Sequence, residues 1–184
     1  PMNPEIPLDG LTLILGGARS GKSSFAENVA RETGQSVLFI ATAAAGDAEM
    51  AERIRQHRAS RPAQWQTLEC PRDIGDSLTE PVADVVIVDC ITLLVSNVLF
   101  ALPENSPAET VIQKVRMEID KLIAAQARLG GRWLLVSNEV GMGVVPPYPL
   151  GRIYSDALGW ANQALARSAR RVIFMIAGIP LVIK

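Results

Sequence analysis

An eight-residue segment near the start of the chain constrains the fold more than any other feature. It reads Gly-Gly-Ala-Arg-Ser-Gly-Lys-Ser and runs from Gly16 to Ser23. Glycines at its first and sixth places, followed by lysine and serine, match the P-loop pattern, in which backbone N–H groups surround phosphate oxygens. The apolar run Leu11 to Leu15 precedes the segment, and the stretch from Ser23 to Glu32 reads as a helix. This strand, loop and helix context predicts a nucleotide-binding site.

The residues of this segment have distinct predicted tasks. Lys22 can reach the β- and γ-phosphates of a nucleoside triphosphate, and the Ser23 hydroxyl can bind Mg²⁺. The residues before the lysine are predicted to contact the phosphates: Gly16, Gly17, Ala18, Arg19, Ser20 and Gly21. The alternative interpretation is a glycine-rich turn that holds no ligand.

A second acidic element is expected wherever a P-loop binds Mg²⁺ together with a triphosphate. Asp89 follows the apolar run Val85 to Val88, and this spacing places a carboxylate at the end of a buried strand. We therefore predict that Asp89 holds the same Mg²⁺ as Ser23. A helix-capping aspartate is the alternative.

Short apolar runs alternate with segments of helical periodicity along the whole chain. The runs predict five buried strands, at Leu11–Leu15, Ser36–Ile40, Val85–Val88, Trp133–Ser137 and Val172–Ile176, with a further short edge strand at Leu181–Ile183. Strands that alternate with helices predict an α/β fold with a mostly parallel sheet and helices on both faces. Together with the P-loop, this order indicates a single RecA-like domain of the P-loop NTPase type over residues 11–184, after an N-terminal extension of residues 1–10.

The clearest predicted helix follows Ser106. Its apolar residues recur every three or four positions and form one stripe: Val111, Val115, Ile119 and Leu122. The sequence Ser106-Pro107-Ala108-Glu109 predicts a capping box with proline at the first helical position.

The composition excludes several classes of function. Lys and Arg total 18 and Asp and Glu total 19, and this balance argues against nucleic-acid or membrane-surface binding. Two cysteines, Cys70 and Cys90, and a single histidine are too few for a four-ligand zinc site. No apolar stretch reaches the roughly 18 residues of a membrane span, and the start of the chain does not resemble a signal peptide. We therefore expect a cytoplasmic protein with reduced thiols.

The single histidine, His57, lies among four arginines: Arg53, Arg55, Arg58 and Arg61. One interpretation is a histidine near a helix end with solvated arginines around it. The other is a nucleophilic imidazole that attacks a phosphorus atom while guanidinium groups hold the phosphates. The residues by themselves leave both interpretations open.

Further motifs are spread from Leu11 to the C-terminus, in one order. Besides GGARSGKS they are Ile40-Ala41-Thr42, Glu49-Met50, Arg53-Ile54, Gln56-His57-Arg58, Arg61-Pro62, Trp65, Glu69, Asp89-Cys90-Ile91-Thr92, Asn97, Asn138-Glu139-Val140-Gly141-Met142-Gly143 and Asn162-Gln163. With these motifs the chain resembles the bifunctional adenosylcobinamide kinase / adenosylcobinamide-phosphate guanylyltransferase family of cobalamin biosynthesis. The combination of GGARSGKS and NEVGMG is far more specific than a P-loop alone.

The resemblance implies two reactions and a homotrimeric assembly. In the first reaction, ATP or GTP phosphorylates the hydroxyl of the aminopropanol arm of adenosylcobinamide. In the second, GMP passes from GTP to that phosphate through a guanylyl-histidine intermediate, and adenosylcobinamide-GDP forms. His57 occupies the place of the guanylylated histidine, so the resemblance makes His57 and Lys22 the catalytic residues.

The resemblance also assigns nucleotide contacts outside the P-loop. They fall on Ala41, Thr42, Arg58, Ala59, Ser60, Arg61, Glu69 and Asp89. A carboxylate such as Glu69 can accept hydrogen bonds from the N1–H and exocyclic amine of guanine, a pairing that adenine does not offer. Without the resemblance, a surface carboxylate on a short edge strand is the alternative for Glu69. Two positions depart from the family pattern: Asp89 stands where some relatives have Glu, and Ser155 where relatives often have Arg.

Two alternatives stay open at this stage. One is a P-loop kinase of a small molecule that lacks the guanylyl-transfer step. The other is an NTP-hydrolysing switch protein, although the chain has no Asn-Lys-x-Asp motif of the kind that reads guanine in such switches.

Overall fold

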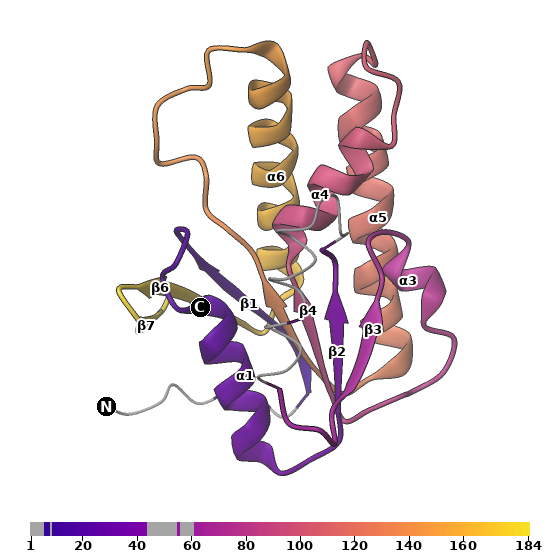
Figure 1. Cartoon of the computed structure of the whole chain (residues 1–184), viewed down its shortest axis with the longest axis vertical. Helices are drawn as coiled ribbons and strands as arrows, with labels where there is room; N and C mark the ends of the chain where they lie inside the picture. Colours follow the sequence, from indigo (N-terminus) through magenta and orange to yellow (C-terminus); the bar gives the residue numbers. More distant parts are fainter. Residues whose placement is uncertain (1–5, 8, 44–54, 56–60) are drawn as a thin grey trace.

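Seven strands form one sheet in the computed structural model, which describes residues 6, 7, 9–43, 55 and 61–184 (Figure 1). The strands are β1 (Gly10–Gly16), β2 (Val37–Ala41), β3 (Gln66–Glu69), β4 (Val85–Asp89), β5 (Arg132–Val136), β6 (Arg171–Ile176) and β7 (Ile179–Val182). Their spatial order is β3-β2-β4-β5-β1-β6-β7. The first six strands run parallel, and β7 pairs antiparallel with β6.

All five predicted buried strands are confirmed, with bounds that differ by one residue or so. The predicted edge strand is confirmed as β7, but it begins at Ile179 and contains Pro180. Proline is tolerated on an edge strand because no further strand needs its missing N–H. The four-residue strand β3 is the addition that the apolar runs did not indicate, since its two end residues are exposed and its two middle residues are only half-buried.

Helices cover both faces of the sheet, as predicted (Figure 1). On one face lies α1 (Lys22–Thr33), and on the other lie α4 (Ile91–Phe100), α5 (Ala108–Leu129) and α6 (Pro149–Ser168), with the short α3 (Ile74–Ser77) against α5. Alternate strand residues serve the two cores: Leu13 packs with α4, α5 and α6, whereas Ile14 packs with α1. This alternation explains why the strands read as continuous apolar runs.

Helix α5 buries the predicted apolar stripe, since Val111, Val115, Ile119 and Leu122 are each at most 4% exposed. The predicted capping box is wrong. Pro107 is the N-cap residue rather than the first helical residue, and no side chain caps the helix. The reason is local, because the Ser106 N–H bonds the carbonyl of Pro103 and Ser106 thereby belongs to the preceding turn.

Within the described part of the chain, no helix combines the length and the hydropathy that a membrane crossing requires.

Candidate active site

The candidate site lies at the carboxyl edge of the sheet, where ligands bind in open α/β folds. The strand register pairs Glu69 with Ala41, Ala41 with Asp89, and Asp89 with Val136. Val136 in turn pairs with Ile14 of β1, just before the glycine loop. The ends of β3, β2 and β4 and the predicted P-loop therefore follow one another along a single edge.

The glycine loop after β1 packs tightly against the turn between β6 and β7. A Cβ atom on Gly16, whose φ is +151°, would lie 2.5 Å from the main-chain oxygen of Met175 and 2.6 Å from the Ser20 hydroxyl. A Cβ atom on Gly21, whose φ is +94°, would lie 3.2 Å from the Cα atom of Gly178. Both glycines of the motif are thus required by the backbone, whether or not a ligand is bound.

Two backbone hydrogen bonds fix the shape of this loop. The Ser20 N–H donates to the carbonyl of Gly17 at 3.3 Å, and the Gly178 N–H donates to the carbonyl of Ser20 at 2.9 Å. The loop and the first turn of α1 enclose a hollow of about 230 Å³ that is lined by Arg19, Ser20, Gly21, Lys22, Ser23 and Ser24. The amino end of a helix opening into such a hollow favours an anion.

Lys22 turns back into this loop. Its ammonium group donates to the carbonyl of Gly17 at 2.5 Å and lies 3.5 Å from the Ser20 hydroxyl. Burial lowers the pKa of Lys22, and the nearby acidic groups of Cys90 and Asp89 oppose that shift. A bound phosphate would favour the charged lysine further, since an opposite charge nearby raises the pKa of an ammonium group.

Two oxygen donors suited to Mg²⁺ belong to the same candidate site as Lys22. Asp89 is the half-buried last residue of β4, and its charge acts on the Lys22 ammonium. Ser23, in the first turn of α1, presents a half-buried hydroxyl to the hollow. One carboxylate and one hydroxyl, completed by phosphate oxygens and water, form the kind of oxygen set that Mg²⁺ prefers, so the residues present fit this ion.

Thr42 joins the ends of β2 and β4. Its hydroxyl accepts a hydrogen bond from the Cys90 N–H at 2.7 Å and donates one to the Cys90 carbonyl at 2.8 Å, while its own N–H donates to the carbonyl of Asp89. The side chain is fully buried, and its hydroxyl is engaged with backbone. Burial also raises the pKa of the Cys90 thiol, which favours the neutral form of this side chain.

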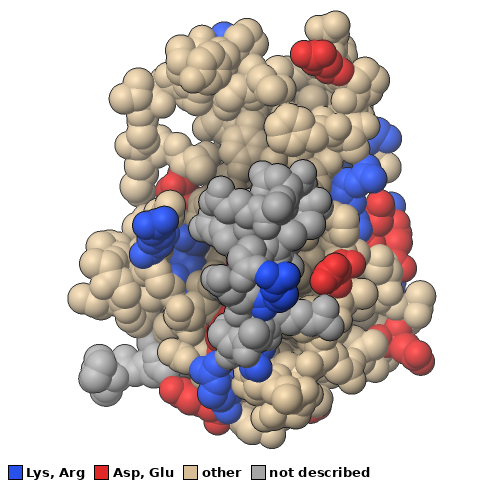
Figure 2. All heavy atoms as spheres, viewed as in Figure 1, with Lys and Arg blue, Asp and Glu red and all other residues tan. Residues whose placement is uncertain are grey.

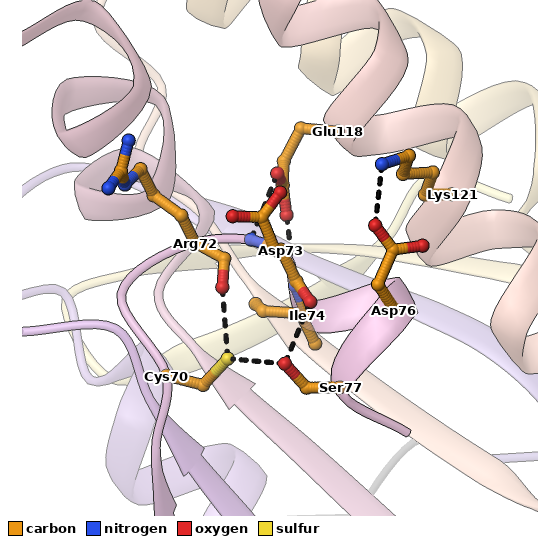
Figure 3. Close-up of polar contacts among 8 residues, drawn as sticks. All are labelled: Cys70, Arg72, Asp73, Ile74, Asp76, Ser77, Glu118 and Lys121. Atoms are coloured by element: carbon orange, nitrogen blue, oxygen red, sulfur yellow. Dashed lines mark hydrogen bonds and ion pairs between the residues drawn. The ribbon is translucent and has the colours of Figure 1, made fainter. Parts of the chain in front are cut away.

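The segment after β3 is fastened to α5, as Figure 3 shows. The carboxylate of Glu118, only 6% exposed, accepts hydrogen bonds from the N–H groups of Asp73 and Ile74 at 3.0 and 3.1 Å. Lys121 forms an ion pair with Asp76 one turn further along α5. These contacts fix the chain that leads away from Glu69, although burial raises the pKa of the Glu118 carboxyl.

The loop after β5 is held beside the P-loop. The Glu139 N–H donates to the carbonyl of Gly16 at 3.1 Å, and the Asn138 N–H donates to the Thr92 hydroxyl. Asn162 of α6 bonds both the Ser137 hydroxyl and the Asn138 carbonyl. Sequence reasoning gave Glu139 no role, yet β5 lies between β1 and β4, and a carboxylate directly after such a strand is a signal that could have been used.

Part of the predicted site falls outside the described residues, namely His57, Arg58, Ala59 and Ser60. Arg61 is described, and its guanidinium carbon lies 3.4 Å from the centre of the Phe39 ring of β2. Glu69 ends the edge strand β3. Charges of both signs are spread over the face of the molecule seen in Figure 2.

The glycine loop between β1 and α1, the lysine turned into it and the acid that ends β4 define a P-loop NTPase-type protein. One strand, β5, separates the P-loop strand from the acid-bearing strand, which is the RecA-like order. A family model described as cobinamide kinase / cobinamide phosphate guanyltransferase matches residues 12–183, and the chain belongs to this family. The family expected from the motifs is thereby confirmed.

Curated relatives agree over nearly their whole lengths. The bifunctional adenosylcobalamin biosynthesis protein CobP of Pseudomonas aeruginosa is 46% identical over 94% of this chain and 96% of its own length. The proteins named CobU of Salmonella typhimurium and Escherichia coli are 43% and 39% identical, each over 95% of this chain and 99% of their own lengths. Among solved structures, the RadB recombinase has a TM-score of 0.48 at 14% identity, covering 90% of this chain and 73% of that chain. This last similarity is too distant to add to the assignment.

Proposed function

We propose that this chain catalyses two successive group transfers on a corrinoid substrate. The first passes the γ-phosphoryl group of ATP or GTP to the hydroxyl of the aminopropanol arm of adenosylcobinamide. The second passes GMP from GTP to the resulting phosphate and yields adenosylcobinamide-GDP and pyrophosphate. The family match over residues 12–183 carries this proposal, and the P-loop with its buried lysine supports it.

In the first transfer, the glycine loop holds the triphosphate. The Lys22 ammonium exchanges its bond to the Gly17 carbonyl for the β- and γ-phosphate oxygens. Ser23 and Asp89 would hold Mg²⁺, which when bound neutralises charge on those oxygens. The substrate hydroxyl oxygen attacks the γ-phosphorus and releases its proton to water, the bond from that phosphorus to the β–γ bridging oxygen breaks, and the nucleoside diphosphate leaves.

In the second transfer, the imidazole of His57 is the nucleophile. One ring nitrogen attacks the α-phosphorus of GTP, a P–N bond forms, and the bond to the α–β bridging oxygen breaks, so that pyrophosphate leaves. A phosphate oxygen of adenosylcobinamide phosphate then attacks the same phosphorus and releases the imidazole. Two easier displacements thus replace one difficult exchange.

The proposed nucleotide contacts extend along the carboxyl edge of the sheet. Glu69 accepts hydrogen bonds from the guanine base, which gives the second transfer its preference for GTP over ATP. The remaining contacts are proposed for residues 16–23 and for Ala41, Thr42, Arg58, Ala59, Ser60, Arg61 and Asp89. Because the Thr42 hydroxyl is engaged with Cys90, the contact proposed for Thr42 does not use that hydroxyl.

Incubation with GTP labelled at the α-phosphorus tests the second transfer. The wild-type chain should acquire label that is stable to base and labile to acid, as expected of a phosphorus–nitrogen bond. His57→Ala should acquire none, yet it should still phosphorylate adenosylcobinamide with ATP. Label on His57→Ala, or an unlabelled wild type, would overturn the guanylyl-histidine step.

We further propose a homotrimer that works in the cytoplasm, with residues 11–184 as one domain and residues 1–10 as an extension. The resemblance to the family supports the trimer, and the unpaired thiols of Cys70 and Cys90 suit a reducing compartment. Light scattering coupled to size-exclusion chromatography measures the mass of the assembly, and a monomer mass would contradict the trimer.

A further inference from the structure

We infer that Asn97 of α4 is a positioning residue for guanylyl transfer. Its side chain holds the segment after β2 and the segment after β3 in a fixed relation. This inference rests on the function proposed above, because Asn97 would act through Glu69 and through the chain that continues towards His57.

The carboxamide nitrogen of Asn97 donates two hydrogen bonds. One goes to the carbonyl of Thr42 at 2.8 Å, and the other goes to the carbonyl of Pro71 at 3.0 Å. Both partners are acceptors, so only a group with two N–H bonds at this place can satisfy both. An aspartate, which has nearly the same shape, would instead direct a negative oxygen at two carbonyl oxygens.

The two carbonyls belong to the segments that matter for the guanine half of the proposed site. Thr42 is the first residue after β2, and the chain continues from it towards His57. Pro71 follows Glu69 by two residues, and the Cys70 N–H between them donates to the carbonyl of Ala41 at 2.9 Å. The position of Glu69 relative to Thr42 is thus set by the β2–β3 ladder, by the Cys70 bond that extends it, and by the two bonds of Asn97.

Asn97 is itself well anchored, because α4 starts at the end of β4. The Leu94 N–H donates to the Cys90 carbonyl. The Thr42 hydroxyl in turn bonds both the N–H and the carbonyl of Cys90. The P-loop has other supports, from Gly178 and Glu139. A defect at Asn97 should therefore impair the guanylyl half and leave phosphate binding at the P-loop largely intact.

The test compares the two half-reactions in the same protein. In Asn97→Asp, self-guanylylation with α-labelled GTP should slow about 100-fold, the cost typical of a small misplacement of reacting groups. The preference for GTP over ITP, which lacks the exocyclic amine that Glu69 would bind, should also fall. Phosphorylation of adenosylcobinamide by γ-labelled ATP should stay within about threefold of wild type. Asn97→Ser, which keeps one donor, should be intermediate and decides the matter if the aspartate variant does not fold.

Asp84→Asn is the matched control, because Asp84 joins β2 and β4 at the opposite edge of the sheet. It should leave the ratio of the two reactions unchanged. Equal losses of both reactions in Asn97→Asp, or guanylylation and base preference like those of wild type, would overturn the inference alone. A wild type that takes up no label would instead overturn the proposed function, and the inference with it.

Discussion

The two edges of the sheet join the same pair of strands, β2 and β4, by different means. At the amino edge, one carboxylate oxygen of Asp84 accepts hydrogen bonds from the hydroxyl and the N–H of Ser36 at 2.6 and 3.2 Å, and the Asp84 N–H donates back to that hydroxyl. At the carboxyl edge, the hydroxyl of Thr42 and the amide of Asn97 make the corresponding ties.

The difference is one of charge. The amino edge uses an ionised carboxylate at an exposed position, where water solvates it, and the hydrogen bonds from Ser36 lower the pKa of Asp84. The carboxyl edge makes its ties with neutral groups, which cost less to bury than ions. Under the proposed function, Lys22 and Asp89 at the carboxyl edge are available to the nucleotide and its Mg²⁺, whereas Asp84 at the amino edge serves stability.

The largest effect should come from Lys22→Met at the carboxyl edge. Loss of the ammonium group removes the charge that faces the β- and γ-phosphates, and phosphorylation of adenosylcobinamide by ATP should fall about 10³-fold. The melting temperature should change little, because the hydrogen bonds of Lys22 to other described residues go to its own loop. A variant that melts far below wild type would show that the lysine serves the fold, contrary to the comparison.

Asp89→Asn should have the next largest effect. An amide binds Mg²⁺ more weakly than a carboxylate, so activity at a fixed Mg²⁺ concentration should fall roughly 100-fold and recover in part as Mg²⁺ is raised. A titration of initial rate against Mg²⁺ measures this shift. A curve that coincides with that of wild type would remove Asp89 from the proposed ion site.

Asp84→Asn at the amino edge should have the smallest effect, and on stability alone. Since the folded pKa of Asp84 is lowered, its contribution to stability is present above the unfolded value of about 4 and is lost as the pH falls through the folded value. The variant should be slightly less stable than wild type at pH 7, and the two unfolding curves in urea should converge below about pH 4. Loss of either transfer reaction in a folded variant would contradict the proposal that the amino edge serves stability alone.

The buried strands and the P-loop could be predicted because their signals are contiguous in the sequence. Residues 11–15 and 85–88 are apolar on both faces, and the glycines stand at fixed spacing. The cap of α5 was wrong because Ser106 satisfies a turn one residue too early, a choice that the motif does not reveal. No apolar run indicated strand β3, because its pairing with β2 rather than its own hydropathy makes it a strand.

The supporting contacts of the site were beyond prediction for a different reason. Asn97 was noticed as part of a family motif, but its partners Thr42 and Pro71 lie 55 and 26 residues away. Glu118 likewise bonds Asp73 and Ile74 across 45 and 44 residues. Such contacts depend on how helices lie over the sheet, and a helical stripe indicates which face is buried but not which backbone group a polar residue meets.

The outer strand β7 has a consequence for solubility. Ile179 and Leu181 are 69% and 50% exposed, and an edge strand with such side chains can template the addition of foreign chains. Pro180 stands between them and offers no N–H to an incoming backbone. This single imino acid interrupts the row of outward-facing N–H donors and so opposes growth of the sheet into fibrils by strand addition.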